Sequence, residues 1–116
     1  MQYDSKTPIY LQVITAIKLD IINERIRSGE KLPSSRDLAV QYTINPNTAA
    51  RVYQELEREG VCYTKRGMGT FVTEDMEKIK QCRHEMAMGC LTDFLRQINE
   101  LGISKDEAIE MIQQTN

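Results

Sequence analysis

Three polar side chains on one predicted helix have the types and the spacing that could read DNA. Asn47 and Thr48 are adjacent, and Arg51 follows one helical turn later. Asparagine pairs with adenine through both ends of its amide, arginine pairs with guanine or a phosphate, and threonine contacts a phosphate or a thymine methyl group. The same residues also fit a solvated polar face, which most surface helices have. Which interpretation holds depends on the elements that position them.

Five further residues are either cations or glycines that let the backbone approach a nucleic acid closely. Arg36, in the first turn of the preceding predicted helix, can anchor a phosphate or pair with a surface residue four positions away. Lys65 and Arg66 stand beside Gly67 and Gly69, where the backbone can approach a minor-groove wall or a phosphate. A solvated hairpin tip would have the same composition. The expected DNA-binding set is Arg36, Asn45, Asn47, Thr48, Arg51, Lys65, Arg66, Gly67 and Gly69.

Residues for metal, redox or catalytic chemistry are too few or wrongly spaced. Cys62, Cys82 and Cys90 are odd in number and form no C-x-x-C pair, so we expect reduced thiols and no zinc ribbon. His84, the single histidine, lies about 200° around a helix from Cys82, so the two cannot share an ion without a partner chain. The chain has no phosphate-binding loop and no nucleophile motif. We expect no enzyme activity, no metal and no other cofactor.

Composition is that of one globular domain with an appendage. The 116 residues include 15 Lys+Arg and 17 Asp+Glu, a net charge of −2. Residues 1–74 hold 10 basic and 9 acidic residues, whereas residues 75–116 hold 5 and 8. The near-neutral segment 1–74, the head, can bind phosphates if its cations share one face. The acidic segment 75–116, the tail, should then point away from them. We find no membrane span and no signal peptide, and expect a cytoplasmic protein with no membrane partner.

Three helices are predicted in the head. The first runs near 8–27, with Thr7 as cap and Pro8 as first residue, and buries a stripe that begins with Tyr10 and Val13. The second runs near 35–42 after a capping-box pattern that begins at Ser34, and it turns Leu38, Ala39 and Tyr42 inward. The third runs 46–59, with Asn45 as cap and an inward stripe of Ala49, Val52, Tyr53 and Leu56.

A β-hairpin is predicted to follow the third helix. Residues 61–65 and 70–73 are β-prone runs on either side of the glycine-bearing turn 66–69. Three helices with a tight turn at 43–45, followed by a two-stranded hairpin, form a winged helix-turn-helix, whose recognition helix fits the major groove. A winged helix can also serve as a protein-interaction or RNA-binding module, which would carry an apolar patch in place of the cations.

Residues 75–116 predict a two-helix tail for self-association. A long helix from Asp75 to the Gly102 break and a short one after Ser104 carry an apolar face too wide for one small neighbour. We therefore expect a homodimer. The fold class is mainly α with a small β-hairpin, with a winged helix-turn-helix over 1–74 and a dimerisation segment over 75–116. The expected dimerisation residues are Met76, Ile79, Met86, Cys90, Leu91, Phe94, Leu95, Ile98, Ile109 and Ile112.

The head resembles the GntR family of bacterial transcription regulators over about residues 7–74. The matching motifs are PIYLQ at 8–12, SGEKLPSSRDLA at 28–39, NPNT at 45–48, LEREG at 56–60 and RGMGTFV at 66–72. The resemblance implies a dimer on a palindromic operator, with Arg36, the start of the third helix and the wing-tip glycine touching DNA. The short tail and the NPNT motif resemble the YtrA-like subgroup of that family.

The resemblance also implies control of a membrane-transporter operon. The wider family tends to place arginines where this chain has Pro46 and Ala50, so its operator sequence is not carried over. The tail of 42 residues is too short for a ligand pocket of ordinary size inside one chain, so we expect any small-molecule effector at a subunit boundary. Repression is the simplest mode of action, because a small dimer on a promoter blocks polymerase without further contacts.

Overall fold

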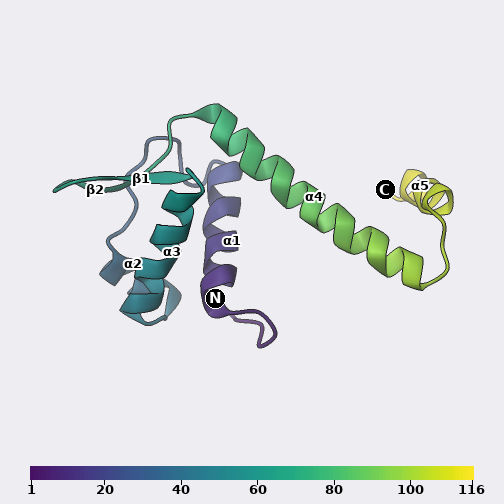
Figure 1. Ribbon diagram of the computed structural model, residues 1–116, viewed down its shortest axis with the longest axis horizontal. Helices are drawn as coiled ribbons and strands as arrows, with labels where there is room; N and C mark the ends of the chain where they lie inside the picture. The colour runs from purple at the N-terminus through teal and green to yellow at the C-terminus, as the bar shows by residue number, and fades with distance from the viewer. The chain divides into compact units, whose positions relative to one another are not determined.

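The computed structural model describes residues 1–116 and contains five helices and one antiparallel hairpin (Figure 1). The contacts divide the chain into two compact units, Met1–Cys82 and Arg83–Asn116. The sequence placed the start of the tail at residue 75, where the long helix begins, whereas the contacts divide that helix after its first turns. The elements are α1 (Ile9–Ile22), α2 (Ser35–Tyr42), α3 (Pro46–Arg58), β1 (Cys62–Lys65), β2 (Gly69–Val72), α4 (Met76–Glu100) and α5 (Lys105–Gln114).

Helix α1 is shorter than the sequence predicts. It buries Val13, Ile14, Ile17 and Ile21 but ends at Ile22, five residues before the expected end. The chain leaves the helix because Glu24 has a left-handed backbone with φ of 61°, and the N–H groups of residues 25 and 26 both donate to the carbonyl of Asp20. The predicted end at residue 27 is therefore wrong.

The predicted start of α1 is also wrong in detail. Pro8 is the N-cap rather than the first helical residue, and no side chain caps the helix. The predicted cap, Thr7, does not cap the helix, and its carbonyl accepts a hydrogen bond from the side-chain amide of Gln12 at 2.8 Å.

Helices α2 and α3 have the boundaries that their capping residues predict. The Ser34 hydroxyl accepts a hydrogen bond from the N–H of Asp37 at 3.1 Å and begins α2. Thr43, in the left-handed region with φ of 55°, ends α2 and turns the chain toward α3. The two helices contact each other, α3 also contacts α1, and the inward residues predicted for α2 and α3 are all buried. The head core centres on Val13, Ile17, Val52, Leu56 and Val72.

Two tyrosine hydroxyls hold α2 at its ends. Tyr53 of α3 donates a hydrogen bond to the carbonyl of Pro33 at 2.5 Å, just before α2 begins. Tyr3, in the N-terminal segment, donates to the carbonyl of Tyr42, the last residue of α2. Burial raises the pKa of both tyrosines, so the hydroxyls stay protonated and remain donors at neutral pH.

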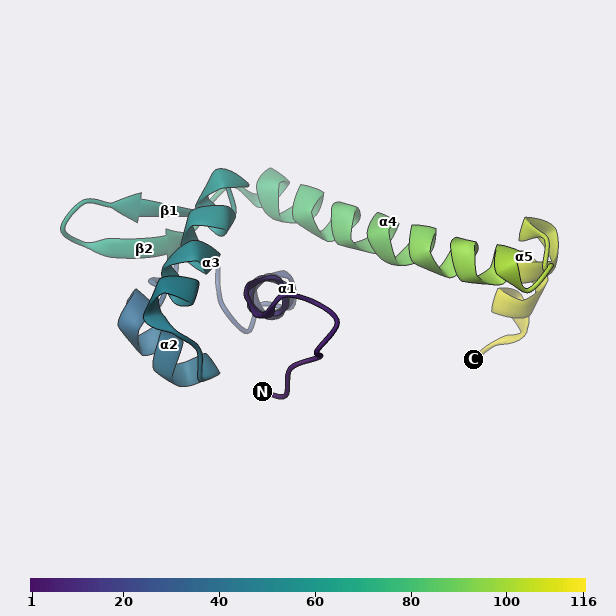
Figure 2. The same ribbon diagram turned by 60° about the horizontal axis from the view of Figure 1, so that its bottom comes forward.

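The hairpin extends from the C-terminal end of α3 (Figure 2). Strands β1 and β2 pair antiparallel, with Cys62 opposite Val72 and Lys65 opposite Gly69. The connector before α2 adds a short third pairing, because Lys31 forms a bridge with Phe71 and the N–H of Leu32 donates to the carbonyl of Thr70 at 2.8 Å. The hairpin is thereby tied to the start of α2 as well as to α3.

The second unit contains most of α4 and all of α5. Ser104 caps α5 by accepting a hydrogen bond from the N–H of Glu107 at 3.1 Å, as the sequence predicts. Ala108 is its one buried side chain, and large apolar side chains elsewhere in the unit are exposed. None of the five helices has the length and apolar character needed to cross a membrane.

Candidate nucleic-acid interface

The first turn of α3 presents two of the expected base-reading residues. The Asn45 side chain accepts a hydrogen bond from the N–H of Asn47 at 2.8 Å, which satisfies one of the free donors at the helix start. Pro46 occupies a position where a missing N–H costs nothing. Asn47 is exposed and Thr48 half-buried. Asn45 is thus occupied in capping, while the Asn47 amide is open to solvent.

Arg51, one turn further along α3, rests on a tyrosine of α1. The Cζ atom of its guanidinium lies 3.7 Å from the centroid of the Tyr10 ring, within the range of a cation–π interaction. A stacked guanidinium keeps its N–H donors directed outward in its own plane, where they can reach a base edge or a phosphate. The sequence placed Tyr10 on the buried face of the first helix; it is half-buried and supports a candidate DNA-binding residue.

The remaining polar residues of α3 are less available. Arg58 donates two hydrogen bonds to Glu55, at 2.7 and 3.1 Å, on the same helix. The Arg58 hydrogen bonds lower the pKa of the Glu55 carboxyl, so the pair stays ionised. Since the Arg58 side chain is 70% exposed and that of Glu55 is 32% exposed, solvent screens this ion pair and it contributes little to stability. The outward stripe of α3 therefore offers its donors mainly at its N-terminal end.

Arg36 projects from the first turn of α2 and is exposed. The residue four positions later is Val40, which is 77% exposed and cannot form an ion pair. The surface-pair alternative considered for Arg36 therefore has no partner at that spacing. A guanidinium at this position is available for a phosphate.

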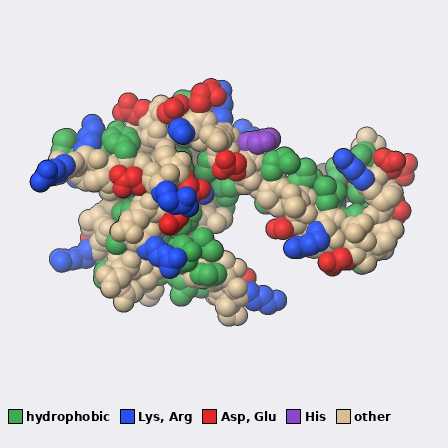
Figure 3. All heavy atoms as spheres, viewed as in Figure 1, with side chains coloured by type: hydrophobic (Ala, Val, Ile, Leu, Met, Phe, Trp, Pro, Cys, Tyr) green, Lys and Arg blue, Asp and Glu red, His purple; other side chains and the backbone are tan.

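The hairpin carries its cations at the tip and on the strand that leads to it. In the space-filling view, Lys and Arg side chains gather at this end of the head (Figure 3). The Lys65 Nζ lies 5.2 Å from the ring centroid of Phe71 and 5.8 Å from that of Tyr63, and the two rings stack on each other. Arg66 and Gly67 form the exposed turn, with Gly67 in the left-handed region at φ of 78°. The aromatic pair supports Lys65 on the exposed strand face.

Sequence reasoning missed Lys31, which lies between the hairpin and α2. A Cβ atom on Gly69 would stand 2.9 Å from the Lys31 Cε, so the glycine makes room for the lysine stem. A cavity of about 360 Å³ opens here, lined by Lys31, Leu32, Pro33, Ser34 and Asp37 and by Met68, Gly69 and Thr70 of the hairpin. Lys31 thereby adds a cation beside the expected wing residues. Lys31 is held there by its bridge to Phe71, a long-range pairing that the local sequence does not reveal.

The residues assigned to dimerisation fall in both units. Met76 and Ile79 belong to the first unit, where they line a cavity with the end of α1. In the second unit Leu91, Phe94, Ile109 and Ile112 are large apolar side chains that are 37–54% exposed. Cys90 is also exposed, whereas Met86, Leu95 and Ile98 are half-buried.

None of the three cysteines forms a disulfide. Cys62 and Cys82 are buried, and burial raises the pKa of the Cys62 thiol to about 12. Cys62 therefore stays protonated and acts as a small core residue at neutral pH.

The chain matches known proteins in sequence over nearly its whole length. Residues 9–72 match the family described as "Bacterial regulatory proteins, gntR family". An uncharacterized HTH-type transcriptional regulator of Bacillus subtilis, YhcF, is 40% identical over 111 residues, which cover 96% of this chain and 92% of that protein. The HTH-type transcriptional repressor YtrA of the same species is 46% identical over 71 residues, 61% of this chain and 55% of that protein.

Solved structures share the fold. A GntR family transcriptional regulator from Listeria monocytogenes superposes with a TM-score of 0.89 at 34% identity, over 98% of this chain and 100% of that one. The DNA-binding domain of AraR, solved in complex with operator ORX1, matches with a TM-score of 0.56 at 28% identity, over 63% of this chain and 90% of that one.

These matches confirm the winged helix-turn-helix fold class and the expectation that the protein is not an enzyme, because the relatives are transcriptional regulators. Together, the family match over residues 9–72 and the similarity to YhcF over 96% of the chain show that this protein belongs to the GntR family of bacterial transcriptional regulators.

Proposed function

We propose that this protein is a sequence-specific DNA-binding repressor that acts in the cytoplasm and binds an inverted-repeat operator as a homodimer. The single observation that carries the proposal is the start of α3. There a capped helix end presents the exposed Asn47 amide, and Arg51 follows one turn later, stacked on Tyr10. A helix N-terminus with these donors suits the edges of bases in the major groove.

The surrounding cations support the same orientation. Arg36 on α2 and Lys31, Lys65 and Arg66 around the hairpin stand on the elements that flank a recognition helix. In winged helices these elements contact the phosphate backbone and the adjacent groove, which fixes the register of the recognition helix. The solved complex of the AraR DNA-binding domain with its operator supports a DNA-bound state for this fold.

The tail supports a dimer. Leu91, Phe94, Ile109 and Ile112 are exposed in one chain, and a second copy would cover them. A twofold dimer presents two α3 helices to successive major grooves about 34–36 Å apart, so the operator should be an inverted repeat with half-sites one turn or a multiple apart.

Repression and a transporter operon as the target complete the proposal. The relative YtrA is named a repressor, and a dimer bound at a promoter blocks polymerase without further contacts. The family resemblance adds control of a transporter operon as the proposed target. The operator sequence identifies the target genes, and the position of the operator relative to their promoters tests repression.

Selection of bound duplexes from a random library, at low and high salt, tests the proposal. The full chain is used, and its mass in solution is measured by light scattering. We expect an inverted repeat to be enriched at both salt concentrations and a dimer mass to be recorded. Asn47→Ala should lose preference at one base position in each half-site. Asn99→Ala, the same change on α4, is the matched control and should leave the enriched sequence unaltered.

The opposite outcome is also informative. Absence of any enriched sequence, together with uniform loss of binding as salt rises, would mean that α3 does not read bases. A winged helix that binds a protein partner or RNA would then be the better interpretation. A monomer mass with an enriched single half-site would refute the dimer and keep the base-reading role.

A further inference from the structure

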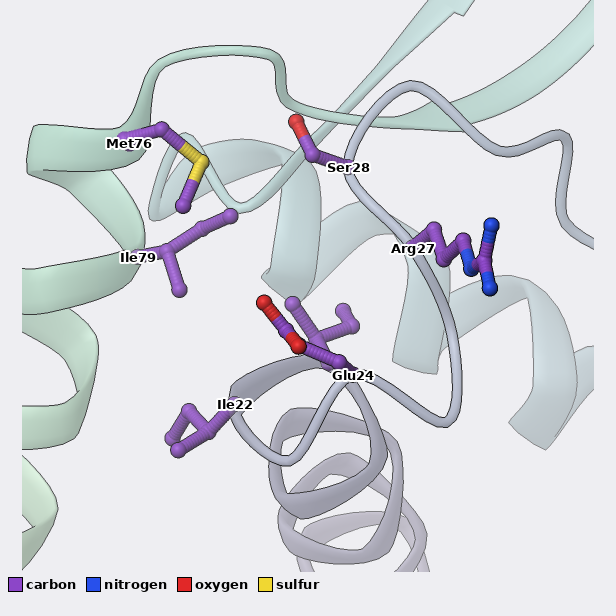
Figure 4. A pocket seen from close by; sticks show the side chains of 7 residues that line it. Ile22, Glu24, Arg27, Ser28, Met76 and Ile79 are labelled. Atoms are coloured by element: carbon purple, nitrogen blue, oxygen red, sulfur yellow. The ribbon is translucent and has the colours of Figure 1, made fainter.

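A cavity of about 410 Å³ lies in the first unit, between the end of α1 and the first turns of α4 (Figure 4). Its volume is within the usual range of small-molecule sites, about 300–1,000 Å³. The wall is mixed, since aliphatic and thioether carbon comes from α1 and α4 and polar groups come from the turn after α1. The lining residues are Ile21, Ile22, Glu24, Arg27, Ser28, Met76 and Ile79.

Glu24 is the polar group that points into this space. Its side chain extends toward Met76 and Ile79, whereas the Arg27 guanidinium points away from them (Figure 4). Glu24 is exposed, and its carboxylate makes no hydrogen bond or ion pair within the chain. Its backbone has φ of 61°, which residues other than glycine rarely adopt, and such conformations concentrate at functional sites.

The C-terminal end of α1 favours a positive charge in the cavity, against the Arg27 guanidinium, which also belongs to the lining. The cavity lies at the C-terminal end of α1, where the helix dipole is negative, and the last turn of α1 contains no basic residue. Arg25, the nearest cation along the chain after Glu24, is bound to Asp20 at 2.7 Å. The Ser28 hydroxyl is also occupied, because it donates to the carbonyl of Thr73 at 2.9 Å.

We propose that this cavity binds a small amphipathic organic cation. Its ammonium or amidinium group would pair with the Glu24 carboxylate, and its apolar body would pack against Ile22, Met76 and Ile79. The sequence led us to expect an effector at a subunit boundary, whereas this site is complete within one chain. The proposal does not depend on DNA binding, because the cavity lining shares no residue with the expected DNA-binding set.

The test uses the full chain with labelled methionine and isoleucine methyl groups, observed by NMR. The probes are 4-phenylbutylammonium, 4-phenylbutanol and 4-phenylbutyrate, which share an apolar body and differ in head-group charge. We expect saturable shifts of the Met76 and Ile79 methyl resonances with the ammonium probe. The affinity for the alcohol should be lower by at least about tenfold, and the carboxylate should not bind.

Two variants of Glu24 and one control give the test its specificity. Glu24→Gln should weaken ammonium binding about tenfold or more, and Glu24→Asn, which suits the left-handed backbone, should do the same. Glu77→Gln removes an equal charge from the first turn of α4, outside the cavity lining, and should leave binding unchanged. Thermal unfolding of each variant reports that the fold is retained.

Three results would overturn the proposal. The first is equal binding of the alcohol and the ammonium probe. The second is an equal loss of binding in the Glu24 and Glu77 variants. The third is that the Met76 and Ile79 resonances respond to protein dilution but to no ammonium probe, because a second copy of the chain would then occupy the cavity.

Discussion

Asn45 caps α3 and is predicted to contact DNA, and substitution can separate these two roles. Asn45→Ala removes the hydrogen bond to the N–H of Asn47 and should lower the free energy of unfolding by about 1 kcal/mol. Asn45→Asp keeps a capping oxygen, so its stability should stay near that of the wild type. Its added negative charge should nevertheless weaken binding to the selected operator. Urea unfolding followed by circular dichroism and a DNA titration measure the two effects; an Asp variant that binds DNA normally would remove Asn45 from the interface.

Arg51 and Lys65 should differ in how their loss affects DNA binding. Arg51→Ala should relax preference at one base or phosphate position, and Tyr10→Leu should give a weaker version of the same change because the guanidinium loses its stacking partner. Lys65→Ala should weaken all sequences alike and reduce the slope of log K against log salt by about 1. Repeating the selection with each variant, at two salt concentrations, distinguishes them. If the Arg51 and Lys65 variants show the same sequence preference and the same salt slope, this division of roles is refuted. Tyr10→Phe, which keeps an aromatic ring under Arg51, is the control for Tyr10→Leu.

The buried Cys62 thiol predicts a loss of stability in alkali. Its pKa rises from 9.0 to about 12 in the folded protein, so the folded state keeps a proton that the unfolded state releases as the pH rises through 9. Stability from this group is complete below about pH 9 and declines as the pH approaches 12. As the pH rises from about 9 to about 11, the free energy of unfolding should fall by about 2 kcal/mol less in Cys62→Ala than in the wild type. Urea unfolding of both proteins at the two pH values measures this difference. An equal fall in unfolding free energy in the two proteins would contradict the raised pKa of Cys62.

At the scale of elements, the hairpin depends on Gly69 for two reasons. Gly67 and Gly69 both have positive φ, at 78° and 119°, and an alanine at either should cost about 1–2 kcal/mol. Only Gly69 faces Lys31, so Gly69→Ala should also displace the lysine and lower DNA affinity beyond the effect of Gly67→Ala. Thermal unfolding and DNA titration of both variants, with Lys31→Ala as the reference for loss of the cation, test this. Equal affinities of the two alanine variants would exclude Lys31 from binding.

The helices whose ends were predicted correctly are those with local signals. Ser34 and Asn45 each bond to an N–H two or three residues ahead, and such short-range patterns are visible in the sequence. The end of α1 has no such signal. Ile26 continues the apolar spacing, and the break depends on the Asp20 carbonyl accepting from two later N–H groups.

The candidate site was predictable to a similar extent. Residues at the start of α3 and in the hairpin tip are recognised by type and spacing, and the structure places them at an exposed helix start and turn. Tyr10 and Lys31 were not predicted as part of the site, because each matters through a contact with a residue about forty positions away, Arg51 and Gly69 respectively. Pattern reasoning along the chain identifies groups that can bind and misses those that support them.

At the scale of the whole molecule, the exposed tail residues predict concentration-dependent behaviour. Phe94→Asp places a charge among side chains that a second copy would cover and should shift the protein from dimer to monomer. Affinity for the full inverted repeat should fall by more than tenfold, while a single half-site is bound as before. Light scattering and DNA titration measure both, with Thr92→Asp, an exposed position about 160° around the same helix from Phe94, as the control. A Phe94→Asp protein that remains a dimer would refute the tail as the interface.

The two tyrosine bonds that hold α2 in place have a consequence for how this regulator can diverge. Both hydroxyls donate to main-chain carbonyls, those of Pro33 and Tyr42, and a carbonyl is present whatever the side chain. Outward positions of α2 such as Arg36 and Val40 can therefore mutate while the helix keeps its place. Gene duplication followed by drift at these positions offers a route to altered affinity for DNA, because a phosphate contact can be gained or lost while the scaffold stays in place.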